Sequence, residues 1–184
     1  MSELYANNFY EILHVLSKNH NLKNKIIKLI ETRPIAGKVI EEESRKKEFI
    51  KILQKLIMGE IPDLNTAYHQ VQNKIPRNTS KYADNSRVFT RDWAERLVRI
   101  QLSRFYNQAV MEILNDSGEE DCFIPHSQYE DHNTLCTTEM AGKKHKVKPL
   151  YNKLIDIYEN ENYNRYAKTI PQHPNCTHVI RPII

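Results

Sequence analysis

The sequence predicts an α+β fold, with a helical N-terminal part followed by a small C-terminal α+β module of short strands. Over residues 1–60, apolar side chains recur at the three- and four-residue spacings of amphipathic helices. Glycine is rare, with four residues in 184, so few tight turns are forced on the chain. After Gly118 the helical periodicity gives way to short β-prone stretches interrupted by proline. We therefore divide the chain into a helical region, residues 1–60, and a second module, residues 61–184.

Three apolar stripes predict helices in the first region, and each stripe occupies one helical face. The stripes are Phe9, Ile12, Leu13 and Leu16; Leu22, Ile26, Leu29 and Ile30; and Phe49, Ile52, Leu53, Leu56 and Ile57. Pro34 closes the second stripe, since the residue before a proline avoids the helical conformation. Gly59 and Pro62 close the third. The charged run from Glu41 to Glu48 is interpreted as a solvated helix face, because its positive and negative charges nearly cancel.

The second module begins with a short helix over residues 64–72 and a loop over residues 76–86, where turn-forming residues are dense. The longest helix follows, with Thr90 as its N-cap and Gly118 beyond its end.

Arginines are dense around the start of this helix, and they suggest contact with a phosphate backbone. The candidate nucleic-acid-binding residues are Arg91, Arg96, Arg99 and Arg104. An alternative interpretation fits the same pattern, in which the arginines pair with Asp92 and Glu95 on a solvated face.

Beyond Gly118 we expect short strands around one more helix. The stretch at residues 121–127 suits an edge strand interrupted by Pro125, and residues 143–150 alternate weakly around Val147. A helix is expected over residues 150–163, with Leu150, Leu154, Ile157 and Tyr158 on one side. A final strand over residues 177–183 is expected to stop at Pro182.

Composition excludes several classes of protein. With 40% hydrophobic and 27% charged residues, the chain is typical of a globular protein rather than a disordered one. No stretch approaches the roughly 18 apolar residues that a membrane span needs, so no membrane partner is expected. Three widely spaced cysteines favour a reducing compartment over a disulfide framework. The formal net charge of +4 permits contact with nucleic acid without requiring it.

Two clusters of metal-ligand residue types occur in the second half of the chain. The first contains Asp131, His132 and Cys136, and the second contains His173, Cys176 and His178. Thiolate and imidazole are the preferred ligands of zinc, and two local pairs would close the long loop between them. We predict a metal site, with zinc as the cofactor, whose ligands are His132, Cys136, His173 and Cys176. In the alternative interpretation the cysteines are small buried residues and the histidines form local hydrogen bonds.

The remaining cysteine and two further histidines are assigned structural roles. Cys122 is expected in the core, and His126 and His145 are expected to be structural. Nucleophile-elbow, P-loop, zincin and deaminase motifs are missing from the sequence. Histidine density alone supports an alternative function, a small metal-dependent nuclease or toxin using His132, His173 or His178. A nucleic-acid-binding regulator acting through the arginine-rich helix is a third hypothesis.

Three segments resemble the Mu F-like group of phage head morphogenesis proteins, the minor head proteins. They read "RDWAERLVRIQLSRFYNQAVMEILNDSG", "DHNTLCTTEMAGKKHKV" and "IPQHPNCTHVIRP". The residues that match the family pattern are Arg99, Asn107 and Ala109; Asp131, Cys136, Gly142 and Lys143; and Pro171, His173, Pro174, Asn175 and Cys176. The resemblance covers roughly residues 85–184. Many relatives carry a second cysteine before the Gly-Lys pair, so here His132 or Asp131 would have to replace it.

The resemblance implies that residues 61–184 are a Mu F-like minor head module in a non-enzymatic structural protein. Such a protein would lie in the virion head, near the portal, after synthesis in the cytoplasm of the bacterial host. Its expected partners are the phage portal or capsid proteins, with non-specific contact to DNA. Its expected role is head assembly, or DNA packaging and delivery.

Overall fold

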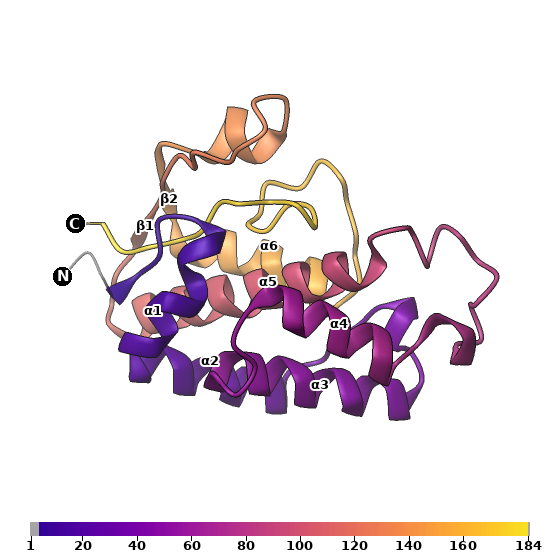
Figure 1. Ribbon diagram of the computed structural model, residues 1–184. Coiled ribbons are helices and arrows are strands. Elements are labelled where there is room, and N and C mark those ends of the chain that lie inside the picture. Colours follow the sequence, from indigo (N-terminus) through magenta and orange to yellow (C-terminus); the bar gives the residue numbers. More distant parts are fainter. Residues whose placement is uncertain (1–3, 184) are drawn as a thin grey trace.

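In the computed structural model, which describes residues 4–183, there are six α-helices, one of which is central, and one small sheet lies beside them (Figure 1). The helices are α1 (Ile12–Lys18), α2 (His20–Thr32), α3 (Glu43–Met58), α4 (Leu64–Lys74), α5 (Trp93–Asp116) and α6 (Val147–Tyr158). The strands are β1 (Asp121–Ile124) and β2 (Lys143–Lys146), which pair antiparallel. Helices come first and short strands follow, so the predicted α+β fold is confirmed.

The N-terminal helices form because their apolar stripes find partners on neighbouring helices. Of the three stripes, only Leu13 is partly exposed and every other member is buried. Helix α2 ends at Thr32, before the predicted stop at Pro34. Gly59 caps α3 in the left-handed conformation, with φ of +82°, which glycine adopts without steric cost.

One expectation about this region holds only in part, because the charged run at residues 41–48, most of which belongs to α3, is not entirely a solvated face. Arg45 is buried, with 4% of its surface exposed. Its guanidinium donates to the carbonyl oxygens of Val39, Ile75 and Pro76 and to the hydroxyl of Thr79, at 2.7–2.9 Å. Arg45 therefore joins the chain before α3 to the chain after α4.

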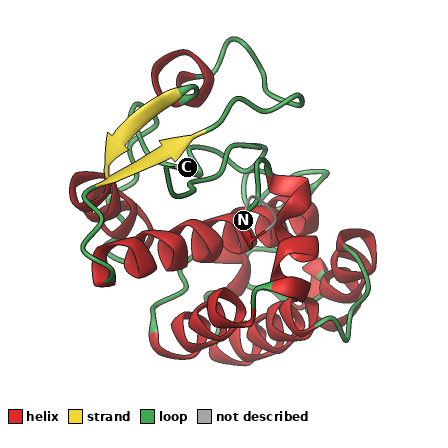
Figure 2. Cartoon of the chain, turned by 90° about the vertical axis from the view of Figure 1, so that its left-hand side faces the viewer, coloured by secondary structure: helices red, strands yellow, loops and turns green. Residues whose placement is uncertain are grey.

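Helix α5 is the central element of the molecule and packs against α2, α4 and α6 (Figures 1 and 2). Sixteen of its 24 residues are buried, which is typical of a core helix rather than a surface helix. Asp92, not Thr90, stands at its N-cap position, and Thr90 instead donates its hydroxyl hydrogen bond to Asp92. Gly118 follows the helix with φ of +77°, as predicted for a residue beyond the C-terminus.

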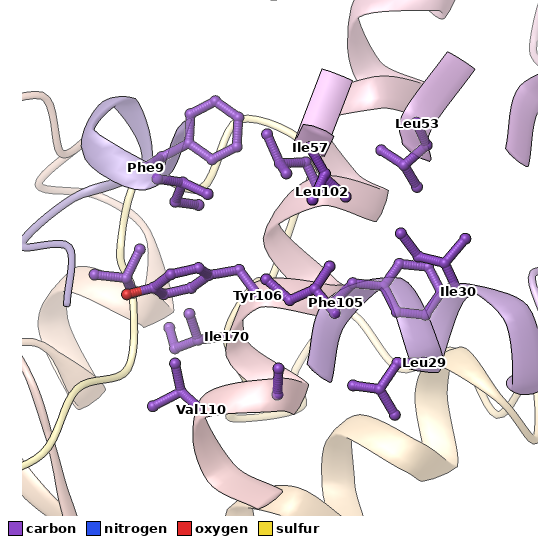
Figure 3. Packing of buried hydrophobic residues seen from close by; sticks show 14 of the residues in the cluster. Phe9, Leu29, Ile30, Leu53, Ile57, Leu102, Phe105, Tyr106, Val110 and Ile170 are labelled. Carbon is purple, nitrogen blue, oxygen red and sulfur yellow. The ribbon is translucent and has the colours of Figure 1, made fainter. Parts of the chain in front are cut away.

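Neighbouring side chains of α5 serve opposite sides of the core. Figure 3 shows Phe105 pointing toward Leu29 and Ile30 of α2, while Tyr106 points the other way. The Tyr106 hydroxyl accepts a hydrogen bond from the backbone N–H of Ala6 at 2.8 Å. Helix α5 therefore contacts α2 on one face and the chain at Ala6 on another.

The strand predictions hold in part. Strand β1 ends before Pro125, as expected for an edge strand. Strand β2 ends at Lys146, and Val147 begins α6, so Val147 is a helical residue rather than the middle of a strand. The expected final strand is wrong and is reduced to one bridge between Phe123 and Arg181.

The physical reason lies in what binds the backbone of this last segment. The Ile180 N–H donates to the side chain of Asn107 at 2.7 Å, and the Thr177 carbonyl accepts from the Phe9 N–H at 2.9 Å. These backbone groups are thus satisfied by α5 and by the N-terminal chain rather than by a neighbouring strand.

One hydrophobic cluster includes buried residues from Ala6 to Ile180. It draws on both the residues before position 60 and those after it, and the division at that position stays a prediction. Within residues 4–183, every helix is too short or too polar to cross a membrane.

Candidate metal centre

Two loops that are far apart in sequence meet above α5 and bring the predicted ligand clusters together. The first loop ends in a π-helical turn, Cys136–Met140, and the second contains residues 170–178. The Cys136 N–H donates to the side-chain oxygen of Gln172 at 3.1 Å. A backbone-to-side-chain hydrogen bond therefore fixes the start of the turn against the second loop.

Cys136, Cys176 and His178 form a cluster that could bind a metal ion. One ligand atom from each residue lies within 4.8 Å of the other two, and all three residues are at most 2% exposed. The Cys176 sulfur lies 3.8 Å from Nδ1 of His178. His173 approaches from the side, with its Nε2 atom 3.5 Å from the Cys136 sulfur. Two thiols and one imidazole thus gather in one buried place, and the half-buried His173 lies beside Cys136.

Three of the four predicted ligands come together, and the fourth does not. His132 has an 86% exposed side chain, and its Nδ1 atom lies 3.9 Å from a carboxylate oxygen of Glu130. His132 therefore lies apart from the buried cluster, and His178 is the histidine that lies within it. The sequence could have indicated that His178 lies beside Cys176, since side chains two residues apart on extended chain point to the same side.

The pKa values of Cys136 and Cys176 are shifted in opposite directions. The hydrogen bond from Cys176, together with those from His173 and His178, lowers the pKa of Cys136 despite its burial. The same bond to Cys136, with burial, raises the pKa of Cys176 well above its ordinary value. These opposite directions favour the thiolate form at Cys136 over Cys176, and thiolate is the form that binds metals.

His178 is held from its other side by a carboxylate. Its Nε2 atom lies 2.8 Å from a carboxylate oxygen of Glu130. Burial lowers the pKa of His178, but its hydrogen bonds to Cys136 and Glu130 outweigh this effect and raise it overall.

Glycine at position 142 is required by the packing of this loop. Gly142 has φ of +73°, and a Cβ atom there would lie 2.6 Å from Nε2 of His126. Any side chain would thus meet both backbone strain and a clash with an imidazole ring. Gly142 also donates its N–H to the carbonyl of Ile124 at 2.7 Å, which ties the loop to the end of β1.

Of the four candidate nucleic-acid-binding arginines, two reach the surface at least in part and two are buried. Arg91 is exposed and Arg96 is half-buried. Arg99 is 6% exposed and donates to the Pro174 carbonyl at 3.3 Å. Arg104 has no exposed surface and pairs with Glu159 at 3.3 Å. Burial therefore removes Arg99 and Arg104 from the set that could reach a phosphate group.

Cys122, His145 and His126, to which the sequence assigned structural roles, lie in the core or form local hydrogen bonds. Cys122 is buried in the core cluster. His145 forms a hydrogen bond between its Nε2 atom and the Met140 carbonyl at 2.8 Å. His126 forms a local hydrogen bond to Glu130 at 2.9 Å.

Comparisons with protein-family models, with curated proteins and with solved structures find no match to this chain. Conclusions about function therefore depend on the residues and on the contacts between them.

Proposed function

We propose that the chain is a non-enzymatic minor head protein of the Mu F-like type, in which a zinc ion holds the C-terminal loops together. One observation supports this proposal above the others. Of the three segments that resemble the family, the first and the second each contact the third through residues that carry the resemblance.

Each segment contributes a matched residue to these contacts. Arg99 and Asn107, both from α5, bind the backbone of the last segment at Pro174 and Ile180. Cys136, from the middle segment, lies within 3.5 Å of His173 and beside Cys176. Residue types that a family pattern requires at distant positions are thus the types that these contacts need.

The donor set supports zinc among the metals available to a protein. Thiolate and imidazole favour zinc over the hard cations calcium and magnesium, which take oxygen ligands. Around a tetrahedral zinc ion, a sulfur and a nitrogen ligand lie roughly 3.6 Å apart, given Zn–S and Zn–N distances of about 2.3 and 2.1 Å. The observed sulfur-to-nitrogen distances are 3.5 Å for Cys136 and His173 and 3.8 Å for Cys176 and His178.

A structural role for the ion fits better than a catalytic one. The cysteines and His178 are buried, and four protein ligands leave no position for a substrate. The two loops contain little regular structure outside the turn at Cys136–Met140. A metal ion that joins them would offset the entropy of ordering so much irregular chain.

The proposed partners are the portal or capsid proteins of a phage head, in which the chain would act in assembly or in DNA packaging and delivery. Contact with packaged DNA would fall to the exposed Arg91 and the half-buried Arg96.

Co-sedimentation tests this function directly. The chain is expressed with the portal and major capsid proteins whose genes lie nearest to its own in the same genome, and the lysate is separated on a density gradient. We expect the chain to sediment with procapsids, and Cys176→Ser to sediment with them less.

A chain that stays at the top of the gradient, or a gene that lies apart from portal and capsid genes, would contradict the proposal. Degradation of plasmid DNA or RNA by the pure zinc-loaded protein would instead support the metal-dependent nuclease.

A further inference from the structure

Glu130 is a carboxylate that lies directly behind one of the candidate ligands. Its side chain is 8% exposed, and one of its oxygen atoms lies 2.8 Å from Nε2 of His178. The opposite ring nitrogen of His178, Nδ1, faces the Cys176 sulfur at 3.8 Å. The imidazole therefore stands between a carboxylate and a thiol, one at each nitrogen.

This arrangement decides which nitrogen of His178 carries a proton. An ionised carboxylate only accepts hydrogen bonds, so the nitrogen that faces Glu130 must be an N–H. In a neutral imidazole the other nitrogen then holds the lone pair, and here that nitrogen is Nδ1. Metal binding removes any proton from Nδ1, and the lone pair of that nitrogen then points toward the side on which the Cys176 sulfur lies.

Glu130 is itself fixed by contacts on its own loop. It accepts a hydrogen bond from the Ser127 N–H at 3.0 Å, and its other oxygen lies 2.9 Å from Nδ1 of His126. Although burial raises the pKa of Glu130, its hydrogen bonds to His178, Ser127 and His126 lower the pKa overall. The contacts with Ser127 and His126 therefore hold the carboxylate in one place behind His178.

We propose that Glu130 is a positioning residue, which fixes the tautomer and orientation of His178 so that Nδ1 binds the metal. This inference rests on the proposed zinc ion that joins the two C-terminal loops, called the zinc staple below, and it adds a residue that supports one of the ligands. Partners of this kind, behind a metal-bound histidine, contribute to metal affinity although they never touch the ion.

A titration with competing chelator tests the proposal on the full chain. Zinc affinity is measured for the wild type, Glu130→Ala, Glu130→Gln and the control Glu120→Gln, whose carboxylate is 83% exposed and pairs with Lys146. We expect Glu130→Ala to bind zinc roughly 10- to 100-fold more weakly than the wild type. Glu130→Gln should recover part of this loss, because the amide oxygen can still accept from His178, and Glu120→Gln should bind as the wild type does.

A second measurement reads the tautomer without any substitution. In the zinc-loaded wild type, ¹⁵N NMR of the His178 ring should show Nε2 protonated and Nδ1 bound to the metal. This measurement reports the tautomer of His178 even where the Glu130 variants do not fold. A Glu130 that only packed in the loop would not determine that tautomer.

The outcomes separate this inference from the proposal beneath it. Tight zinc binding by the wild type with equal affinity in Glu130→Ala, or with Nε2 of His178 as the ligand, would overturn the role of Glu130 and leave the staple intact. A wild type that binds no zinc would overturn both.

Discussion

The N-terminal helices and the C-terminal loops are stabilised in different ways. Helices α1 to α4 bury apolar stripes that are spread over many residues, and each contributes a part of the core. The loops around Cys136 and Cys176 also bury a few apolar side chains, but they contain in addition polar and sulfur-containing groups that each have a specific partner. The first kind of order is distributed, whereas the second is concentrated. Loss of one residue should accordingly weaken the helices in part but release the loops almost completely.

Helix α5 connects the two kinds of structure. Its apolar side chains, such as Phe105, join the helical core, whereas Arg99 and Asn107 bind the backbone of the last segment. Substitutions on this single helix can therefore be chosen to weaken either part.

Removal of the metal should have the largest effect, and it should be confined to the loops. With a strong chelator, we expect backbone amides in residues 125–142 and 170–181 to exchange rapidly with solvent, while those of α2 and α3 stay protected. Structural zinc binding contributes about 10–16 kcal/mol to the folding of small zinc peptides, which exceeds the contribution of any single core side chain. Hydrogen exchange with mass spectrometry gives the regional result, and equal exchange throughout the chain would show that the two parts are not stabilised separately.

Phe105→Ala should have the next largest effect, and it should act on the helical core. Phe105 has no exposed surface, and such substitutions cost about 3–5 kcal/mol in the free energy of unfolding. Urea denaturation measures the loss, and metal content should stay at the wild-type level. Tyr163→Ala, at a side chain that is 74% exposed, is the control and should change the free energy by less than about 0.5 kcal/mol.

Asn107→Ala tests the connection between the parts. It removes the acceptor of the buried Ile180 N–H, and an unsatisfied buried donor costs about 1–3 kcal/mol. Asn115→Ala, at an exposed position on the same helix, provides the matched comparison. If both variants unfold at the same urea concentration as the wild type, the hydrogen bond to Asn107 does not hold the last segment.

His132→Ala should have the smallest effect. Its side chain is 86% exposed and lies outside the cluster of Cys136, Cys176 and His178. We expect zinc affinity to stay within roughly twofold of the wild type, whereas His178→Ala should lose most of it. A larger loss from His132→Ala than from His178→Ala would restore the ligand set that the sequence suggested.

Sequence reasoning succeeded where structure depends on local periodicity. The stripes of α2 and α3 and the start of α4 at Leu64 follow from spacing alone, since one face of each helix must be buried. It failed where a distant group decides the outcome. The last segment is extended, but Asn107 and Phe9 take its hydrogen bonds, and no local pattern announces this.

The candidate site divides in the same way. The density of cysteine and histidine identified the two loops and, within the buried cluster, Cys136 and Cys176. The choice between His132 and His178 depended on which histidine lies beside the two cysteines in space, and no local pattern gives that. Burial of Arg45 and Arg104 was likewise invisible, because charge patterning alone predicts a solvated face.

Metal analysis of the purified chain tests the central claim most directly. Wild type and Cys176→Ala are prepared without chelator, and their metal content is measured beside their melting temperatures. The account predicts about one zinc ion per wild-type chain, nearly complete loss in Cys176→Ala, and a lower melting temperature for that variant. Equal metal content in the two proteins, or none in either, would contradict the existence of a zinc staple.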